Sequence, residues 1–412
     1  MKSQTPQRVA VIGAGPIGLE AALYAQTLGH DTTVFERGTI ASSVSSWGFV
    51  RLFSPWRLNA SRLGLACRAR RDATSLDLDA CPTGRELVDE YLTHLAEELV
   101  VHEHTEVVAI RRASWLKSEA IGGGTRQDTP FALLVRDAKG EESYIEADVV
   151  IDASGVYRTP LDFGRGGIPP LGLGTRSDDR IVRHIPDVGG SERPNYAGKH
   201  TLVVGSGYSA ATTVAALHEL HGSEDSTRVS WVLRSNRSPL LKRFDDDPLP
   251  ERDALAQRAN EIAERPPAGF EVLTDTTIHS ISSDDSGLNV VVESNSNAER
   301  KTVRADRIVA LVGFRPNWDL SRELQVHLCY ASEGPMKLAA ALLGASGGDC
   351  LEAAPLSPES LKSPEPNFFV VGSKSYGRRN DFLLRTGREQ IRDAFRLIED
   401  KSELDLYSEG SE

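Results

Sequence analysis

The stretch RVAVIGAGPIGLEAALYAQTLGHDTTVFERG, residues 8–38, decides the fold of this chain. Its first five residues are mostly apolar and predict a short buried strand, and residues 17–28 predict an apolar helix. Residues 31–35 predict a second strand. Strand, helix and strand together form a β-α-β unit of about 30 residues, which indicates an α/β fold built on a parallel sheet.

The turn between the first strand and the helix carries the glycine spacing GxGxxG. Gly13 permits a tight turn, Gly15 lets a pyrophosphate approach the backbone, and Gly18 lets the helix pack closely on the sheet. Glu36 ends the second strand, at the place where a carboxylate accepts hydrogen bonds from ribose hydroxyls. The stretch therefore predicts a dinucleotide site with the candidate residues Gly13, Ala14, Gly15, Pro16, Ile17, Gly18, Glu36 and Arg37.

A second unit of the same kind begins near residue 200. A predicted strand at 201–204 leads into Gly205-x-Gly207-x-x-Ala210 and a helix, and alanine is a known variant of the third position. The next strand is followed by Arg234 instead of an acid. An arginine can bind a 2′-phosphate that a carboxylate would repel, so NADPH is favoured over NADH; for Arg237 a solvated basic turn is an equal alternative. The candidate residues of this site are Gly205, Gly207, Tyr208, Ser209, Ala210 and Arg234.

Four short blocks connect the two glycine turns into one pattern. They are IDASG at residues 151–155, GSGYSA at 205–210, LVGFRPN at 311–317 and FFVVG at 368–372. In this order the chain resembles the flavoproteins with two dinucleotide-binding domains. These include flavin-containing monooxygenases, N-hydroxylating monooxygenases and thioredoxin reductase-like enzymes. The resemblance implies an α/β fold of two Rossmann-like domains, the second inserted into the first.

The resemblance also implies the cofactors, with FAD at the first glycine turn and NADPH at the second. It places further FAD contacts at the backbone of Val107, at Gly155, and at Gly372 with Ser373 in the final turn. Many members of the group carry Asp where this chain has Ser373. A serine can still donate one hydrogen bond there.

The predicted domains follow from the same blocks. The FAD-binding domain is expected to comprise residues 8–160 and 305–400, with an insertion at about 327–366. The NAD(P)H-binding domain is expected at 195–304, and residues 161–194, rich in Gly and Pro, are interpreted as a linker. Within the first domain, Thr83 is the predicted N-cap of a helix that runs through residue 99.

Two polar segments supply candidate catalytic residues. In the resembled flavoproteins, the region equivalent to residues 46–56 lines the flavin ring, and Arg51 is the candidate there; packing of an aromatic loop is the alternative. The loop 374–380 precedes the last helix, whose N-terminus the resemblance directs at the flavin. Lys374 and Tyr376 are its candidates, against the alternative of a solvated basic loop.

The cysteines bear on the reaction. Cys67, Cys81, Cys329 and Cys350 are scattered and form no C-x-x-C pair, so the dithiol relay of the disulfide-reducing relatives is missing from the sequence. Cys350 lies in the predicted insertion, where it is either a redox thiol or an incidental one.

The composition limits the partners. The 412 residues carry a net charge of -12, which argues against nucleic acid or an anionic membrane as the main partner. No apolar run approaches the roughly 18 residues of a membrane span. The N-terminus has no secretory pattern, and the histidines have no metal-ligand spacing. We therefore expect a cytoplasmic enzyme with a small-molecule substrate and no metal.

Two functions fit these features. The first is a monooxygenase, in which NADPH reduces FAD and the reduced flavin captures molecular oxygen as a hydroperoxide that oxygenates a small molecule. The second is an NADPH-dependent reductase that passes hydride through FAD to a quinone, a low-molecular-weight disulfide or a partner protein. The missing dithiol and the form of the loop at 205–210 favour the first.

Overall fold

The chain divides into two compact units. The computed structural model describes residues 6–71, 74–122, 124–174, 178–285, 287–344 and 356–408. The first unit comprises residues 1–159 and 314–412, and the second comprises residues 160–313, between those two segments of the sequence. Within the described residues, each unit holds a five-stranded parallel sheet and a three-stranded antiparallel sheet. The α/β class predicted from residues 8–38 is confirmed.

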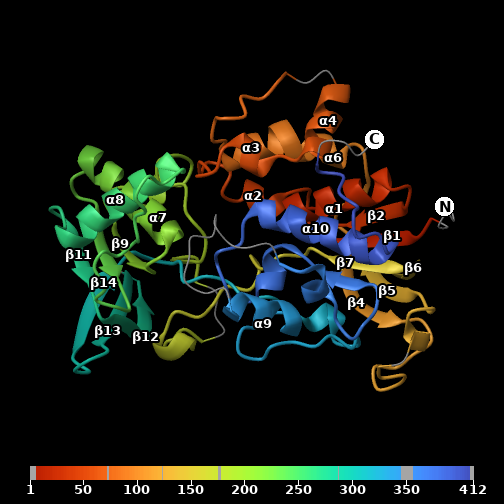
Figure 1. Ribbon diagram of the computed structural model, residues 1–412. Coiled ribbons are helices and arrows are strands. Elements are labelled where there is room, and N and C mark those ends of the chain that lie inside the picture. The colour runs from red at the N-terminus through yellow and green to blue at the C-terminus, as the bar shows by residue number, and fades with distance from the viewer. Residues whose placement is uncertain are drawn as a thin grey trace. The chain divides into compact units, whose positions relative to one another are not determined.

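The parallel sheet of the first unit is covered on both faces (Figure 1). Along its central strand, Val9 and Val11 belong to the core beneath the helices, whereas Ala10 and Ile12 belong to the core beneath the antiparallel sheet. Because both faces of β1 are covered, four of its five residues, Val9 to Ile12, are apolar and buried. The strands, in spatial order, are β16 (Phe368–Val370), β7 (Val149–Asp152), β1 (Arg8–Ile12), β2 (Asp31–Phe35) and β3 (Val100–His102).

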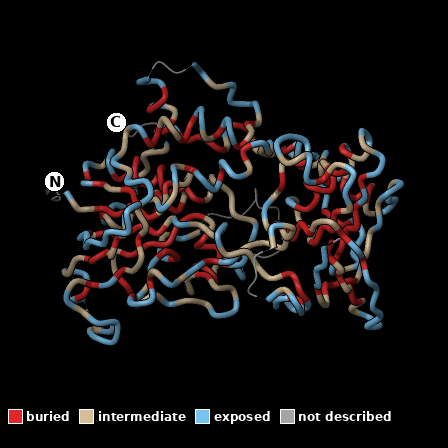
Figure 2. The backbone as a smooth tube through the Cα atoms, turned by 180° about the vertical axis from the view of Figure 1, so that it is seen from behind, coloured by how far each residue is buried: buried red, intermediate tan, exposed pale blue. Residues whose placement is uncertain are grey.

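The remaining elements of the first unit form the layers on either side of this sheet. The helices carry both buried and exposed residues, and the buried ones gather in the interior of the unit (Figure 2). None of the described helices is long and apolar enough to cross a membrane. The antiparallel strands are β4 (Glu106–Arg112), β5 (Phe131–Arg136) and β6 (Glu142–Ala147). The helices are α1 (Pro16–Thr27), α2 (Ser42–Ser45), α3 (Trp56–Asn59), α4 (Arg62–Arg70), α5 (Gly84–Leu87), α6 (Thr93–Ala96), α9 (Met336–Gly344) and α10 (Leu384–Glu399).

The predicted cap at Thr83 is present, but the helix behind it is interrupted. The Thr83 hydroxyl accepts from the Glu86 amide and the Glu86 carboxylate accepts from the Thr83 amide, which makes a capping box. After α5 the chain takes a π-helical turn at Val88–Leu92 before α6, which ends at Ala96.

The final helix α10 crosses α1 closely, since a Cβ on Gly387 would lie 2.3 Å from Cδ1 of Ile17.

The second unit repeats the parallel arrangement. Its antiparallel sheet shares a core with one face of the parallel sheet, and α7 and α8 pack on the other face. The parallel strands, in spatial order, are β11 (Phe270–Leu273), β10 (Arg228–Val232), β9 (His200–Val204), β15 (Arg307–Ala310) and β8 (Ile181–Val182). The other elements are α7 (Tyr208–Ser223), α8 (Pro250–Glu264), β12 (Thr276–Asp284), β13 (Gly287–Ser294) and β14 (Arg300–Ala305).

The structure places three segments differently from the sequence-based boundaries. Residues 161–194, interpreted as a linker, supply the edge strand β8, which pairs with β15 through two residues that are too few to show periodicity. Residues 305–313, assigned to the first domain, include β15 in the second unit's sheet. In the stretch 327–366, α9 contributes Leu338 to the core of the first unit; Cys350 lies outside the described residues.

A buried ion cluster closes the first unit on the side of its antiparallel sheet. Glu365 accepts from Arg112 at 2.7 Å and from Arg126 at 2.7 Å, and all three side chains are almost fully buried. The Gln325 amide also donates to Glu365. Burial alone would raise the pKa of Glu365, but the hydrogen bonds from Arg126, Gln325 and Arg112 outweigh it and lower the pKa.

We predict that Glu365→Gln destabilises the protein by about 3–5 kcal/mol, because two buried guanidinium groups lose their counter-charge. Glu359→Gln is the control: Glu359 pairs with Lys362 on the surface, and such exposed pairs contribute about 0–1 kcal/mol. Denaturant unfolding of both variants measures the difference. Because the folded pKa of Glu365 is lowered, its contribution is present above the unfolded pKa and is lost as pH falls through the folded pKa. Equal unfolding free energies for the two variants would contradict the assignment.

Candidate dinucleotide-binding sites

The first glycine turn has the geometry that its three glycines predict. Gly13 has φ +99°, and a Cβ there would lie 2.8 Å from the Ala153 carbonyl oxygen. A Cβ on Gly18 would lie 1.8 Å from the carbonyl oxygen of Gly13, so only glycine allows this packing. In contrast, no atom lies within 4 Å of a Cβ built on Gly15, the N-cap of α1. The open space at Gly15 and the unpaired amides of the first helical turn fit the diphosphate of FAD.

Glu36 reaches across the turn from the end of β2. Its carboxylate oxygens accept from the Ala14 amide at 2.9 Å and the Gly38 amide at 2.8 Å. The side chain is half-buried, and its two carboxylate oxygens have the capacity to accept further hydrogen bonds. Glu36 therefore supports the glycine turn in addition to the ribose role that the sequence predicts. Arg37, next to it, is exposed.

Two further turns meet the first one at the carboxyl edge of the parallel sheet. Gly155 has φ +71° and follows β7, and Gly372 has φ +73° and follows β16. A Cβ on Gly155 would lie 3.8 Å from Oγ of Ser373. The Gly372 amide donates to Oε1 of Gln390 on α10 at 2.9 Å. Strands that run parallel end at one edge, and this edge is where α/β proteins bind their ligands.

Lys374 lies in this group but is fully buried. Its ammonium donates to Oδ2 of Asp152 at 2.6 Å and to Oγ of Ser154 at 3.1 Å. It also lies 5.0 Å from the centroid of the Trp318 ring. The sequence predicted a reactive or solvated lysine, and the structure shows an ion pair with both side chains 0% exposed.

The other predicted residues of the first site are spread over the unit. Tyr376 is buried and packs edge-on against Phe382, and burial raises its pKa. Val107 lies in β4, where the pairing with β5 shifts register at a bulge. Arg51 is exposed and donates to the carbonyl of Cys81 at 2.5 Å. The described contacts join Lys374 and Ser373 to the glycine turns and do not join Arg51 or Val107 to them.

The second glycine turn repeats the geometry of the first. Gly205 has φ +137°, and a Cβ there would lie 2.3 Å from the carbonyl oxygen of Leu311. Ala210 is fully buried, and its Cβ lies 3.4 Å from the Cβ built on Gly205. An alanine therefore fits at the place where the first turn has Gly18. No atom lies within 4 Å of a Cβ on Gly207, the N-cap of α7. Ser209 is exposed beside it.

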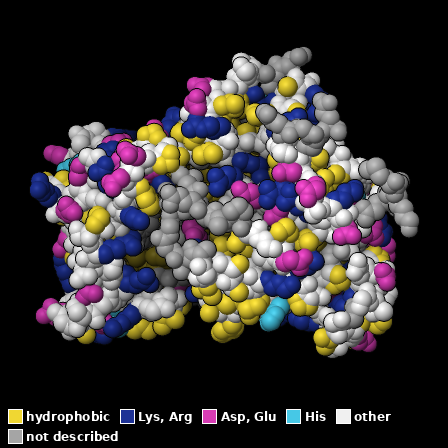
Figure 3. Space-filling view, viewed as in Figure 1, with side chains coloured by type: hydrophobic (Ala, Val, Ile, Leu, Met, Phe, Trp, Pro, Cys, Tyr) yellow, Lys and Arg dark blue, Asp and Glu magenta, His cyan; other side chains and the backbone are white. Residues whose placement is uncertain are grey.

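Arg234 follows β10 at the carboxyl edge of the second unit's sheet. Its carbonyl accepts from Nδ2 of Asn295 at 2.9 Å, which fixes the backbone while the residue stays exposed. Arg237 is exposed three residues later. Figure 3 shows basic and acidic side chains interspersed on the face in view. Arg234 is therefore a candidate for binding a phosphate because it lies at the carboxyl edge of the sheet, and not because the surface is basic as a whole.

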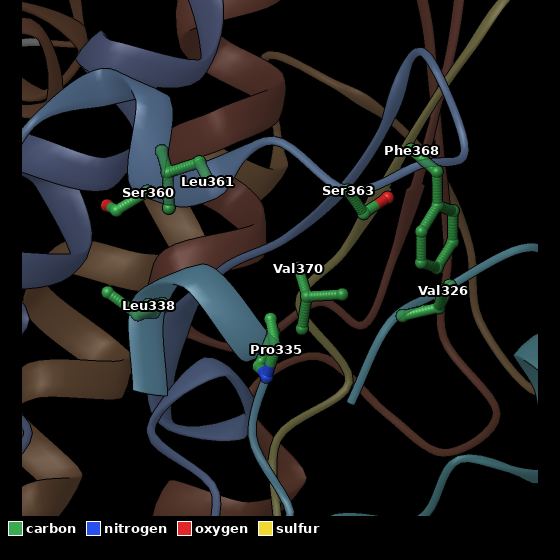
Figure 4. A pocket seen from close by; sticks show the side chains of 8 residues that line it. All are labelled: Val326, Pro335, Leu338, Ser360, Leu361, Ser363, Phe368 and Val370. Carbon is green, nitrogen blue, oxygen red and sulfur yellow. The ribbon is translucent and has the colours of Figure 1, made fainter. Parts of the chain in front are cut away.

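A small pocket in the first unit lies away from these turns. It is formed mainly by apolar side chains of β16, α9 and the 3-10 turn at Pro358–Leu361 (Figure 4). None of the predicted site residues lines it, so it belongs to the packing of α9 and not to the cofactor site. Its lining residues are Val326, Pro335, Leu338, Ser360, Leu361, Ser363, Phe368 and Val370.

The partners that hold the turns were not predicted from the sequence. Asp152 was read as part of a motif, although an acid within an apolar buried strand signals a buried partner. The sequence gives no comparable sign that Gln390 on α10 or Trp318 has a buried partner. Each is a single residue, one polar and one aromatic, outside the quoted motifs. Their roles depend on contacts between residues far apart in the sequence.

Solved structures with the same fold include flavoproteins of more than one activity. A bacillithiol disulfide reductase, Bdr (YpdA), from Bacillus cereus has a TM-score of 0.67 at 16% identity, and the match covers 96% of this chain and 100% of that chain. The Kutzneria sp. 744 ornithine N-hydroxylase KtzI has a TM-score of 0.63 at 16% identity, covering 97% and 100%. The thioredoxin reductase of T. acidophilum has 0.61 at 15%, covering 96% and 99%. These likenesses show the two-domain fold.

Curated proteins match over part of their length. The dihydrolipoyl dehydrogenase of Staphylococcus aureus is 25% identical over 316 residues, which is 75% of this chain and 57% of that protein. The chain therefore spans less than two thirds of that relative. A multifunctional alkene reductase/demethylase OYE of Caballeronia cordobensis is 27% identical over 206 residues, 45% of this chain and 27% of that protein.

Two family models match the chain. Residues 8–99, which contain the first glycine turn, match the model of FAD dependent oxidoreductases. Residues 73–333 match the model of pyridine nucleotide-disulphide oxidoreductases. The predicted class, an oxidoreductase with FAD as cofactor, is confirmed. Because the second match covers more than half of the 412 residues, this chain belongs to the pyridine nucleotide-disulphide oxidoreductase family.

Proposed function

We propose that this chain is an NADPH-using, FAD-dependent monooxygenase that acts on a small molecule. The observation that supports it most is the presence of two built dinucleotide turns in a sequence without a C-x-x-C pair. The bound flavin supplies the two-electron chemistry, and the chain supplies binding, orientation and the exclusion of water. The turns at Gly13 and Gly205 would hold FAD and NADPH, and the bound FAD would supply the electron transfer from NADPH to oxygen.

The described cysteines support direct reaction of the flavin. Cys67 is buried on α4. Burial is the largest influence on its pKa and raises it, so the thiolate form is disfavoured. Cys81 and Cys329 are partly exposed in separate segments of the chain, and no disulfide joins any two of the three described cysteines. A paired thiol that would accept electrons from the flavin is thus missing from the described residues.

The oxygen reaction tests the proposal. We predict that, after anaerobic reduction of the bound FAD with NADPH, admission of oxygen gives a species whose absorbance is neither that of oxidised nor that of reduced FAD, and which persists well beyond mixing. Stopped-flow absorbance measures it. Prompt reoxidation with release of hydrogen peroxide, together with anaerobic turnover of NADPH with quinones or low-molecular-weight disulfides, would support the reductase alternative instead. The fold is compatible with either result, since it occurs in an ornithine N-hydroxylase and in a bacillithiol disulfide reductase.

The FAD assignment is tested at Glu36. Glu36→Arg removes the acceptor for the Ala14 and Gly38 amides and puts a cation at the turn, so we expect the protein to purify with little flavin. Glu323→Arg makes the same charge change at an exposed position of the first unit and serves as control. The ratio of flavin absorbance to protein absorbance measures occupancy. Full flavin in the Glu36 variant would mean that FAD does not bind at this turn.

The preference for NADPH is tested at Arg234. Arg234→Ala removes a cation that would form charge-assisted hydrogen bonds with the 2′-phosphate, so the KM for NADPH should rise about tenfold or more while that for NADH changes little. Arg228→Ala is the matched control, since Arg228 is exposed at the amino end of the same strand β10. Steady-state reduction of FAD with both nucleotides gives the KM values. An equal rise for both nucleotides would refute the preference.

A further inference from the structure

We propose that the buried pair Lys374 and Asp152, together with the exposed Ser154, forms a clamp that holds the Gly155 and Gly372 turns in the conformation that receives FAD. Lys374 is then a positioning residue, which acts on the cofactor through the two turns. This inference rests on the proposed FAD site and adds a residue set to it. The sequence had suggested Lys374 as a reactive residue near the flavin.

The clamp uses the hydrogen-bonding capacity of its charged groups. Oδ1 of Asp152 accepts from the amide and the hydroxyl of Ser154 at 3.1 and 2.6 Å, and Oδ2 accepts from Lys374. The Lys374 ammonium has three donors, which meet Asp152, Ser154 and the face of Trp318. With these contacts made and both charged side chains 0% exposed, Lys374 offers no solvent-accessible proton.

The clamp joins segments that are 220 or more residues apart in the sequence. Asp152 ends β7, whose neighbours in the sheet are β1 and β16. Lys374 lies in the 3-10 turn Gly372–Tyr376, directly after β16. The ion pair therefore ties the end of the central strands to the last turn, across the same edge that carries Gly13.

Each of the joined turns has a conformation that must be held. Gly155 and Gly372 both have positive φ, which glycine adopts readily and also leaves readily. Ser154 directly precedes Gly155, and its amide and hydroxyl both donate to Asp152. Lys374 lies two residues after Gly372. Loss of the clamp should leave the fold in place and lower the fraction of molecules whose turns are ready to bind.

The clamp's effect on FAD can be separated from its effect on stability with three variants. Lys374→Met leaves the Asp152 carboxylate buried without a counter-charge, so both the melting temperature and the affinity for FAD should fall. Lys374→Met with Asp152→Asn removes that unpaired charge and should restore most of the melting temperature, because the desolvation penalty is gone. Glu365→Gln, which disrupts the other buried ion cluster of the unit, should lower the melting temperature alone.

The measurement is the Kd of FAD for the deflavinated protein, by flavin fluorescence, with thermal unfolding followed by circular dichroism. If the turns are ready in only about a tenth of the molecules, the apparent Kd rises about tenfold in both Lys374 variants. Recovery of wild-type affinity together with stability in the double variant would show that the pair is only structural and overturn the clamp. Failure of the wild-type protein to bind FAD would instead overturn the proposed function on which the clamp rests.

Discussion

The close approach of the backbone at Gly13 constrains the rest of the first unit. This turn leaves no room for a side chain against the carbonyl of Ala153, so β1 and β7 must end at the same level. Once these strands are fixed, β2 brings Glu36 under the turn and β16 brings Gly372 beside Gly155. The second unit meets the same constraint at Gly205 and Leu311. Both sites thus follow from parallel strands that end together.

The sequence predicted the parts of each site that depend on local chemistry. The glycine spacings, Glu36, the cap at Thr83 and the two β-α-β starts are all found within a few tens of residues, and the structure has them where they were expected. The short strand β8 was not predicted, because two paired residues in a segment rich in Gly and Pro carry no periodic signal. Likewise α9 lies in a stretch that looked like an insertion, although Leu338 packs into the core.

The buried charges of the first unit are another part that the sequence could not supply. Arg112, Arg126 and Glu365 look like surface residues one by one, since charged side chains are seldom buried without a partner. Their burial depends on a partner more than 200 residues away, as does that of Lys374 with Asp152. The sequence can signal that an acid in an apolar strand, such as Asp152, needs a partner, but it contains no local sign of which distant residue that partner is. For the same reason, Lys374 was interpreted as reactive when its charge is fully engaged.

The discontinuity of the first unit has a consequence for the order in which the protein is completed during synthesis. Translation proceeds from the N-terminus, and domains generally fold as units when their residues are available. All of residues 160–313 are therefore made before β16 and the Gly372 turn exist. The emerging chain carries the first glycine turn without the edge strand β16 of its sheet for more than 200 residues. The first site is consequently completed after the second glycine turn has been made, since it needs β16 and the Gly372 turn.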